Sequence, residues 1–370
     1  MSPEDFDTVS AVPFGYLANR QYVRVDGVDD AMVAAFTTDF RSWRETPLGE
    51  VVTPCPDWTP RWNSYAREVL HSDDRVIVLA LEVDPAATVC DPQNPREFHH
   101  PVAWATSDGV HWDRTATDWP FGSDFTEGGS VMGSWWVDGA FEMVVQSRWV
   151  PITLVLRSAD GITWREIARF NQEPPGDVSM FTALSGDGTR AIVMTTPDDT
   201  NTRTTLSLLV SHDGENWTEV QTAFTGARPN SPEGDDWLGP IFPPRSPIDQ
   251  WTVLLEHDDC FETNRRATIW LSPDLAQWSS ADLPWIVPRA QVYSTRYGLI
   301  ARGGEYCDLT GSEGPATPEG GQLLLSRDGQ TWEPLRPRRL RNFEINVVDG
   351  PAGVFLIDDT GEVWSTGQNG

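Results

Sequence analysis

The sequence contains no lysine, and arginine supplies all 27 of its strongly basic residues. Aspartate and glutamate number 55, which gives a formal net charge of −28 at pH 7. A surface this negative argues against nucleic acid and anionic membranes as partners, because both repel it. Long apolar runs are also missing, since no stretch reaches the ~18 residues that a membrane-spanning helix requires. We therefore expect a protein that does not insert into membranes.

Cysteine is scarce, with four residues in the chain, and none of them forms a C-x-x-C pair. All four lie in polar segments rich in proline or aspartate: Cys55, Cys90, Cys260 and Cys307. An even number in such segments predicts two disulfides and an oxidising compartment. The first residues lack the basic start and apolar core of a signal peptide, so free thiols in a cytosolic protein are the alternative. We expect a secreted or cell-surface protein.

One seven-residue pattern occurs six times: Ser or Thr, any residue, Asp, Gly, two residues, Trp. Two copies have another residue in place of the glycine. Successive aspartates are between 52 and 69 residues apart. A period near fifty residues indicates one supersecondary unit that is repeated along the chain. The pattern aspartates are Asp39, Asp108, Asp160, Asp213, Asp274 and Asp328.

Each copy of the pattern lies between two apolar stretches, which predicts a hairpin turn. The aspartate can accept backbone N–H groups across the turn, and glycine supplies a positive φ. The tryptophan begins the outgoing strand and is large enough to cover a gap to the next unit. A chain of 370 residues holds about 7 such units. We predict an all-β fold, a seven-bladed β-propeller of four-stranded antiparallel blades that forms a single domain over residues 1–370.

The strand pattern places the blades at residues 13–53, 61–117, 128–171, 177–224, 236–283, 289–336 and 343–366. The last blade lacks an outer strand in this division. The N-terminal run at residues 6–12 is predicted to pair there and to close the ring. An open ring would otherwise expose two sheet edges, which closure removes.

The repeat resembles the Asp-box, or bacterial neuraminidase repeat, of sialidases and other β-propellers. In that family the box forms the turn between the third and fourth strands, on the face opposite the ligand site. The resemblance implies that the six aspartates are structural. It also implies that the long loops gather on the other face, at residues 84–101, 225–247, 256–266 and 303–320. Of the three possible disulfide pairings, this arrangement favours Cys55–Cys90 with Cys260–Cys307.

The first residues of the inner strands should line the mouth of a central channel. Arginines from three blades converging there would suit a carboxylate, because each guanidinium offers a fork of donors. The candidate ligand-binding residues are Arg61, Trp62, Asp236, Trp237, Arg289 and Arg341. The resemblance to sialidases implies a tyrosine nucleophile, Tyr293, with Glu344 or Glu127 as its partner and Asp177 as the acid. Sialidases usually have six blades and an Arg-Ile-Pro-like motif in the first blade, which this sequence lacks.

These observations predict a non-catalytic module that binds a glycan or a protein on the loop face. The alternatives are a sialidase-like exo-glycoside hydrolase and an assembly scaffold for a partner protein. We expect a monomer without a cofactor. We also expect no metal site, because the acidic residues near Cys260 lack calcium-loop spacing and the His99-His100 pair lacks zinc-ligand spacing.

Overall fold

A computed structural model gives the fold of the chain. The chain divides into two compact units, each of which is described by itself. Unit 1 comprises Met1–Phe170, Val348–Phe355 and Ser365–Gly370, and unit 2 comprises Asn171–Val347 and Leu356–Trp364. The structure describes residues 8–25, 28–40, 42–55, 59–91, 98–117, 129–147, 152–171, 179–197, 203–229, 236–257, 266–283, 291–302, 323–335, 345–350, 353–358 and 363–365.

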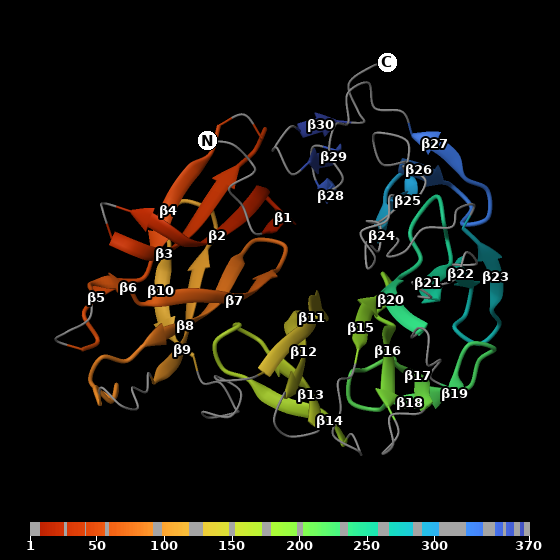
Figure 1. Cartoon of the computed structure of the whole chain (residues 1–370), viewed down its shortest axis with the longest axis horizontal. Coiled ribbons are helices and arrows are strands. Elements are labelled where there is room, and N and C mark those ends of the chain that lie inside the picture. The colour runs from red at the N-terminus through yellow and green to blue at the C-terminus, as the bar shows by residue number, and fades with distance from the viewer. Residues whose placement is uncertain are drawn as a thin grey trace, which may run out of the picture. The chain divides into compact units, whose positions relative to one another are not determined.

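The described residues are all-β, with thirty strands in seven sheets and no helix among them (Figure 1). Within those ranges, no helix is long and apolar enough to cross a membrane. The predicted all-β class and the repeated antiparallel sheets are confirmed. Four of the seven sheets have four strands each.

Three sheets belong to the N-terminal part of the chain, and their strands pair antiparallel except for one parallel pair in the first sheet. The first contains β1 (Thr8–Val12), β2 (Gly15–Val25), β3 (Val28–Thr37) and β4 (Arg44–Leu48), with β5 (Val51–Val52) and β6 (Arg61–Trp62) added at β3. The second contains β7 (Ser64–His71), β8 (Val76–Val83), β9 (His99–Thr106) and β10 (Asp113–Ala116). The third contains β11 (Gly129–Val137), β12 (Ala140–Ser147), β13 (Ile152–Ser158) and β14 (Arg165–Asn171).

Three further sheets follow, and a shorter one completes the set. The fourth contains β15 (Met180–Leu184), β16 (Arg190–Pro197), β17 (Arg203–Ser211), β18 (Thr218–Val220) and β19 (Gly226–Pro229). The fifth contains β20 (Asp236–Phe242), β21 (Trp251–His257), β22 (Arg266–Ser272) and β23 (Ser279–Asp282). The sixth contains β24 (Gln291–Thr295), β25 (Gly298–Arg302), β26 (Leu323–Ser326) and β27 (Glu333–Leu335). The seventh has three strands, β28 (Ile345–Gly350), β29 (Gly353–Asp358) and β30 (Val363–Ser365).

The predicted role of the N-terminal strand is wrong. Strand β1 pairs with β2 from Thr8 opposite Asn19 to Val12 opposite Gly15, so it leads the first sheet. The seventh sheet, as described, contains β28, β29 and β30 but not β1. A two-residue hairpin closes a short loop, whereas pairing with the C-terminal strand would close a loop of the whole chain at a higher entropic cost. The first and last strands therefore belong to different sheets.

Two other boundaries differ from the prediction. Arg61 and Trp62 were expected to begin the second blade, but β6 pairs with β5 and touches β3 in the first sheet. The next residue explains this, because Asn63 binds Glu50 through its backbone N–H and through its side-chain Oδ1. The fifth sheet begins with β20, which contains a bulge between Leu238 and Ile241. Strand β19, in turn, occupies part of a predicted loop.

Apolar side chains from successive sheets pack together within each unit. In unit 1, one cluster joins the first and second sheets, and another joins the second and third. In unit 2, one cluster joins the fourth and fifth sheets, and another joins the fifth and sixth. The second strands are the most enclosed, since all eight residues of β8 are buried. This packing fixes which turns and first strands of neighbouring sheets meet.

Candidate functional site

Two of the six predicted ligand-binding residues and three of the four catalytic candidates lie outside the part of the chain that the structure describes. Strands β6 and β20 place the backbones of Arg61, Trp62, Asp236 and Trp237. Their convergence on one carboxylate site stays a prediction. The predicted site and disulfide residues that lie outside the described ranges are Glu127, Asp177, Arg289, Arg341, Glu344, Cys260 and Cys307.

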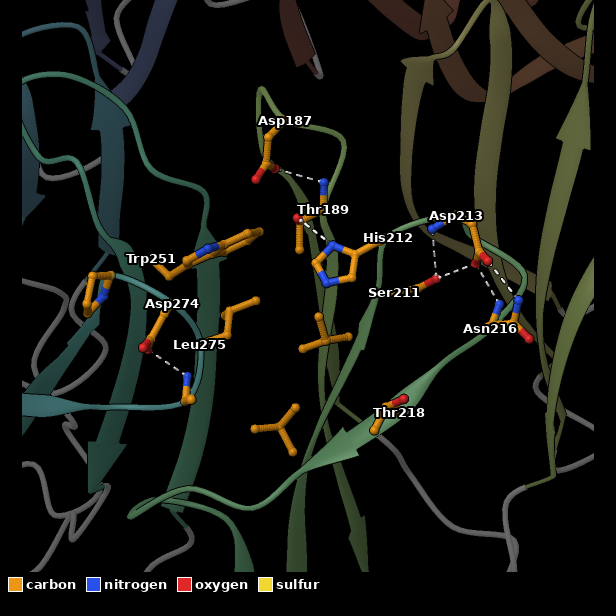
Figure 2. A pocket seen from close by; sticks show the side chains of 14 residues that line it. Asp187, Thr189, Ser211, His212, Asp213, Asn216, Thr218, Trp251, Asp274 and Leu275 are labelled. Carbon is orange, nitrogen blue, oxygen red and sulfur yellow. Dashed lines mark hydrogen bonds between the residues drawn. The ribbon is translucent and has the colours of Figure 1, made fainter.

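Unit 2 contains a cavity of about 600 Å³ at the turn ends of the fourth and fifth sheets (Figure 2). Its lining comes from the β15–β16 turn, the β17–β18 turn, the β22–β23 turn and the start of β21. These turns include two of the Asp-pattern turns, so the cavity lies at the opposite strand ends from the predicted ligand loops. The sequence did not reveal it, because the lining residues are spread from Asp187 to Ala276 and meet only when the sheets pack.

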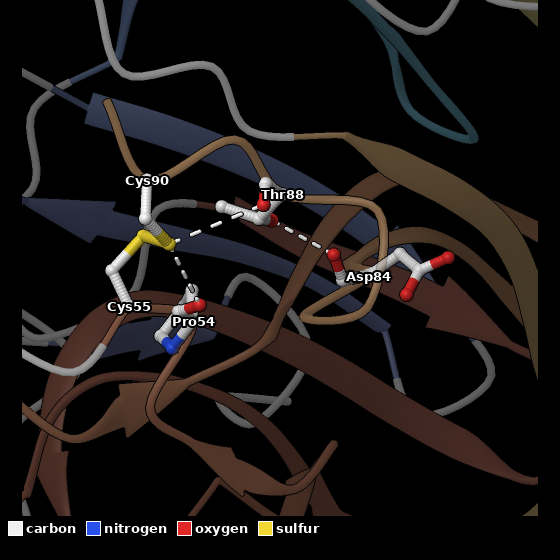
Figure 3. The surroundings of a disulfide bond; sticks show 5 residues. All are labelled: Pro54, Cys55, Asp84, Thr88 and Cys90. Carbon is white, nitrogen blue, oxygen red and sulfur yellow. Dashed lines mark hydrogen bonds between the residues drawn. A yellow bond between two sulfur atoms is a disulfide. The ribbon is translucent and has the colours of Figure 1, made fainter.

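The predicted disulfide between Cys55 and Cys90 is confirmed, with a Cα–Cα distance of 5.5 Å (Figure 3). The loop that leads to Cys90 has its own support. The Asp84 carboxylate accepts the backbone N–H groups of Ala86 and Ala87 at 2.9 and 3.3 Å. The Thr88 hydroxyl donates to the Asp84 carbonyl at 2.8 Å. A disulfide is consistent with the expected oxidising compartment.

The loop held by this disulfide presents apolar surface. Val89 is 43% exposed and Phe98 is 39% exposed, although large apolar side chains are more often buried. The backbone N–H of Asp84 donates to the Phe98 carbonyl at 2.7 Å, which ties the two ends of the excursion together. The face predicted for ligand binding therefore carries two exposed apolar side chains, Val89 and Phe98.

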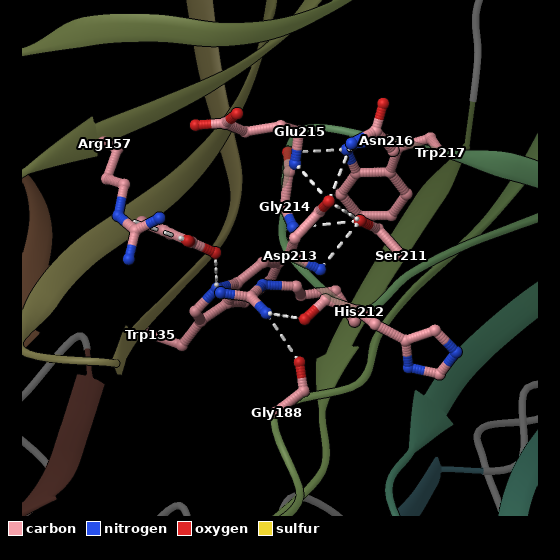
Figure 4. A network of polar contacts seen from close by, with 12 residues as sticks. Trp135, Arg157, Gly188, Ser211, His212, Asp213, Gly214, Glu215, Asn216 and Trp217 are labelled. Atoms are coloured by element: carbon pink, nitrogen blue, oxygen red, sulfur yellow. Dashed lines mark hydrogen bonds and ion pairs between the residues drawn. The ribbon is translucent and has the colours of Figure 1, made fainter.

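The six Asp-pattern segments form the turns that their sequence predicts. In the fourth sheet, Asp213 Oδ1 accepts the N–H groups of Glu215 and Asn216 at 2.9 and 2.7 Å, and Ser211 Oγ accepts the Gly214 N–H (Figure 4). The Asn216 side-chain bond is the main reason that the pKa of Asp213 lies well below its usual range. These bonds are internal to the turn, which fits the expected structural role.

Glycine in the pattern has a second function beside its positive φ. A Cβ on Gly161 would lie 2.2 Å from Ile77 Cδ1 of the second sheet, so the glycine makes room for its neighbour. Where the glycine is absent, the backbone keeps the conformation: Phe40 has φ 59° and Leu275 has φ 64°. The Leu275 side chain is buried in the core between the fourth and fifth sheets. Its apolar burial offsets the strain of a left-handed leucine.

Tyr293, the proposed nucleophile of the sialidase alternative, lies on β24. Its hydroxyl donates to Gln291 Oε1 at 2.9 Å, and Arg302 Nη1 donates to the same oxygen at 2.9 Å. Burial raises the pKa of Tyr293. A nucleophilic phenolate needs the opposite shift, so this environment favours a neutral phenol.

Glu68 was not among the residues that the sequence pattern singled out, and its environment is unusual. It lies on β7, the first strand of the second sheet, and accepts a 2.8 Å hydrogen bond from Ser134 Oγ on β11, the first strand of the third sheet. Burial raises the pKa of Glu68 to about 7, against the lowering effect of that bond. A carboxyl group that holds its proton near neutral pH can act as an acid.

A β-bulge explains why the sequence concealed this position. Regular alternation would place Glu68 on the same face of β7 as Ala66. The register shifts between these two residues, so Ala66 packs toward the first sheet whereas Glu68 faces the third. Bulges of this kind redirect side chains and occur often beside active sites.

Two other acidic side chains in unit 1 are buried and paired. Glu82 accepts hydrogen bonds from Arg114 Nε at 3.1 and 3.0 Å. Glu142 accepts a 2.8 Å bond from Trp135 Nε1 and has Arg157 Nε at 3.7 Å (Figure 4). Such pairs hold neighbouring β-strands together, and removing one partner would leave a buried charge without a counter-charge. Within the described ranges, no group of three or more His, Cys, Asp or Glu residues is arranged to hold a metal ion.

No family model matches the sequence, and no curated protein matches it. Solved structures with some likeness include exo-inulinase from Aspergillus awamori, at 9% identity over 98% of this chain and 90% of that one, with a TM-score of 0.41. A putative glycosidase from Bacteroides thetaiotaomicron VPI-5482 has 13% identity over 69% and 88%, with a TM-score of 0.35. A protein of unknown function from Dyadobacter fermentans DSM 18053 has 14% identity over 96% and 91%, with a TM-score of 0.44. All three TM-scores lie below 0.5, and we infer neither fold nor activity from them.

Proposed function

We propose that the seven sheets are the blades of one β-propeller and that the protein is a glycoside hydrolase with Glu68 as its proton donor. The observation that carries this proposal is a half-buried carboxyl group on a first strand, hydrogen-bonded to Ser134, whose pKa burial raises to about 7. Most glycoside hydrolases use two carboxyl groups, of which one must be protonated to donate to the leaving oxygen. An acid with a pKa of about 7 suits that role near neutral pH.

The position of Glu68 agrees with this role. First strands line the central channel in the propeller that we propose, and both Glu68 and its donor Ser134 lie on first strands. The adjacent bulge residue Arg67 is exposed. Glu127, Asp177 and Glu344, the acidic candidates of the sequence analysis, lie outside the described residues, and the second carboxyl group of the mechanism is not assigned to any of them.

Turnover of a panel of fluorogenic aryl glycosides, a sialoside included, tests the proposal. We expect the Glu68→Gln variant to lose at least ~100-fold in kcat, because an amide cannot donate the required proton. An exposed glutamate on β27 gives the matched control, Glu333→Gln, which should keep wild-type turnover. Wild-type protein that turns over no member of the panel, or a Glu68→Gln variant of full activity, would contradict the proposal.

A second candidate function is binding of a glycan or protein without catalysis, at the loop that Cys55–Cys90 holds. The exposed apolar side chains of Val89 and Phe98 on that loop favour it. Binding to a glycan array that Phe98→Ala weakens and Glu68→Gln leaves intact would support this function. The disulfide also supports a proposed location outside the cytosol.

A further inference from the structure

The cavity between the fourth and fifth sheets has an apolar floor. Trp251 and Leu275 form part of it, and each is only 4% exposed. Val210 and Val220, from the two strands that flank the Asp213 turn, add aliphatic surface. A volume of about 600 Å³ is within the range of small-molecule sites, which are typically lined by apolar groups with a few polar ones.

The rim of the cavity is negative. Asp187, Asp213 and Asp274 line it, and the pKa of each lies below its usual value. For Asp187 the main cause is the Ser185 hydroxyl, and for Asp274 it is the backbone N–H of Gln277. These carboxylates therefore keep their charge at any ordinary pH. Among the described residues that line the cavity there is no arginine, and His212 is the one basic side chain.

The rim is held in place before any ligand arrives. Arg190 is fully buried, and its Nη1 donates to the carbonyls of Gly188 and His212 at 2.7 and 2.9 Å. These two bonds join the β15–β16 turn to the β17–β18 turn. His212 Nδ1 is also 3.0 Å from Thr189 Oγ1. A preformed rim reduces the ordering cost of binding.

The arrangement of the side chains favours one kind of occupant. Trp251, Asp187 and Asp274 all line this cavity (Figure 2). The hydrogen bonds that Asp274 receives within the described residues end on Oδ1, so Oδ2 can accept from a ligand. A cation beside an indole gains from the ring quadrupole as well as from the carboxylates. An apolar stem would cover the floor.

We propose that this cavity binds a small organic cation, an ammonium, amidinium or guanidinium group on an apolar stem. Its site lies in unit 2, at the strand ends that carry the Asp pattern, whereas the hydrolase proposal rests on Glu68 of unit 1. The two proposals therefore stand or fall separately.

Calorimetric titration of the full chain with benzamidine tests the proposal, and benzamide is the neutral ligand of the same shape. We expect benzamidine to bind and benzamide to bind at least ~tenfold more weakly. The Asp187→Asn and Asp274→Asn variants should each weaken benzamidine binding about fivefold, the size expected for loss of one partly exposed charge pair. Added salt should also weaken it, because the rim is open to solvent.

The matched control is Asp328→Asn, which makes the same change in the equivalent turn of the sixth sheet, outside the cavity lining. It should bind benzamidine like the wild-type protein. Equal binding of benzamide, equal weakening by Asp328→Asn, or no benzamidine binding at millimolar concentration would each overturn the proposal.

Discussion

Titration of Glu68 should make the stability of the protein fall as pH rises. Its pKa is raised from 4.5 to about 7, with burial as the main cause. The folded protein therefore holds the Glu68 proton more tightly than the unfolded chain does. Its contribution is fully present below pH 4.5 and is lost as pH rises through 7, because the folded state then contains a half-buried charge.

The size of this effect follows from the two pKa values. A rise from 4.5 to about 7 corresponds to about 3.4 kcal/mol of unfolding free energy between the two pH limits. Solvent reaches part of the carboxyl group, so screening should reduce the observed difference to about 2 kcal/mol. In the Glu68→Gln variant the amide oxygen can still accept from Ser134, and no charge develops. This variant should be about 2 kcal/mol more stable than the wild-type protein at pH 8 and similar to it at pH 4.5.

Denaturant unfolding followed by tryptophan fluorescence at several pH values measures this difference. The informative quantity is the gap between wild type and Glu68→Gln as a function of pH, since all other titrating groups cancel in it. Glu333→Gln, the same change at an exposed position, is the matched control. A gap between wild type and Glu68→Gln that does not change with pH would refute the reasoning.

Two further predictions concern the scaffold. Replacing Cys55 and Cys90 with serine should lower the free energy of unfolding by about 4 kcal/mol, because the disulfide closes a loop with a sequence separation of 35. Non-reducing peptide mapping that pairs either cysteine with another partner would contradict this prediction. Gly161→Ala should cost about 2–3 kcal/mol, because a Cβ meets the second sheet at a φ of 73°. Gly139→Ala has a similar φ of 71° but nothing within 4 Å, so thermal unfolding should show a loss of only about 1 kcal/mol. Equal losses in the two variants would show that space beside Gly161 is unimportant.

The repeated turns could be predicted from sequence because each is a local structure. The hydroxyl, the carboxylate and the glycine that make the Asp213 turn lie within four residues of one another. The pairing of Cys55 with Cys90 could also be predicted, because the repeated pattern assigns the loops of both cysteines to the same face. Long-range features had no such local signal. Strand β1 pairs with its nearest neighbour along the chain, and the sequence pattern alone did not distinguish that partner from a distant one.

The acidic candidate on β7 could not be found from alternation, because one extra residue in the strand reverses the face of everything after it. Similarly, the lining of the cavity depends on which turns of two sheets meet. Asp187 belongs to a turn without the full seven-residue pattern, and Trp251 is a strand residue outside the repeat. Both sites depend on sheet packing, which periodicity does not specify.

The hairpin between β1 and β2 bears on how the chain is made. Strands β1 to β4 occupy residues 8–48 and pair in sequence order. In a ring closed by pairing of the first and last strands, the sheet that contains both strands would stay incomplete until both had been synthesised. Here the first sheet has these four strands available once residues 8–48 have emerged, so folding during synthesis can begin there.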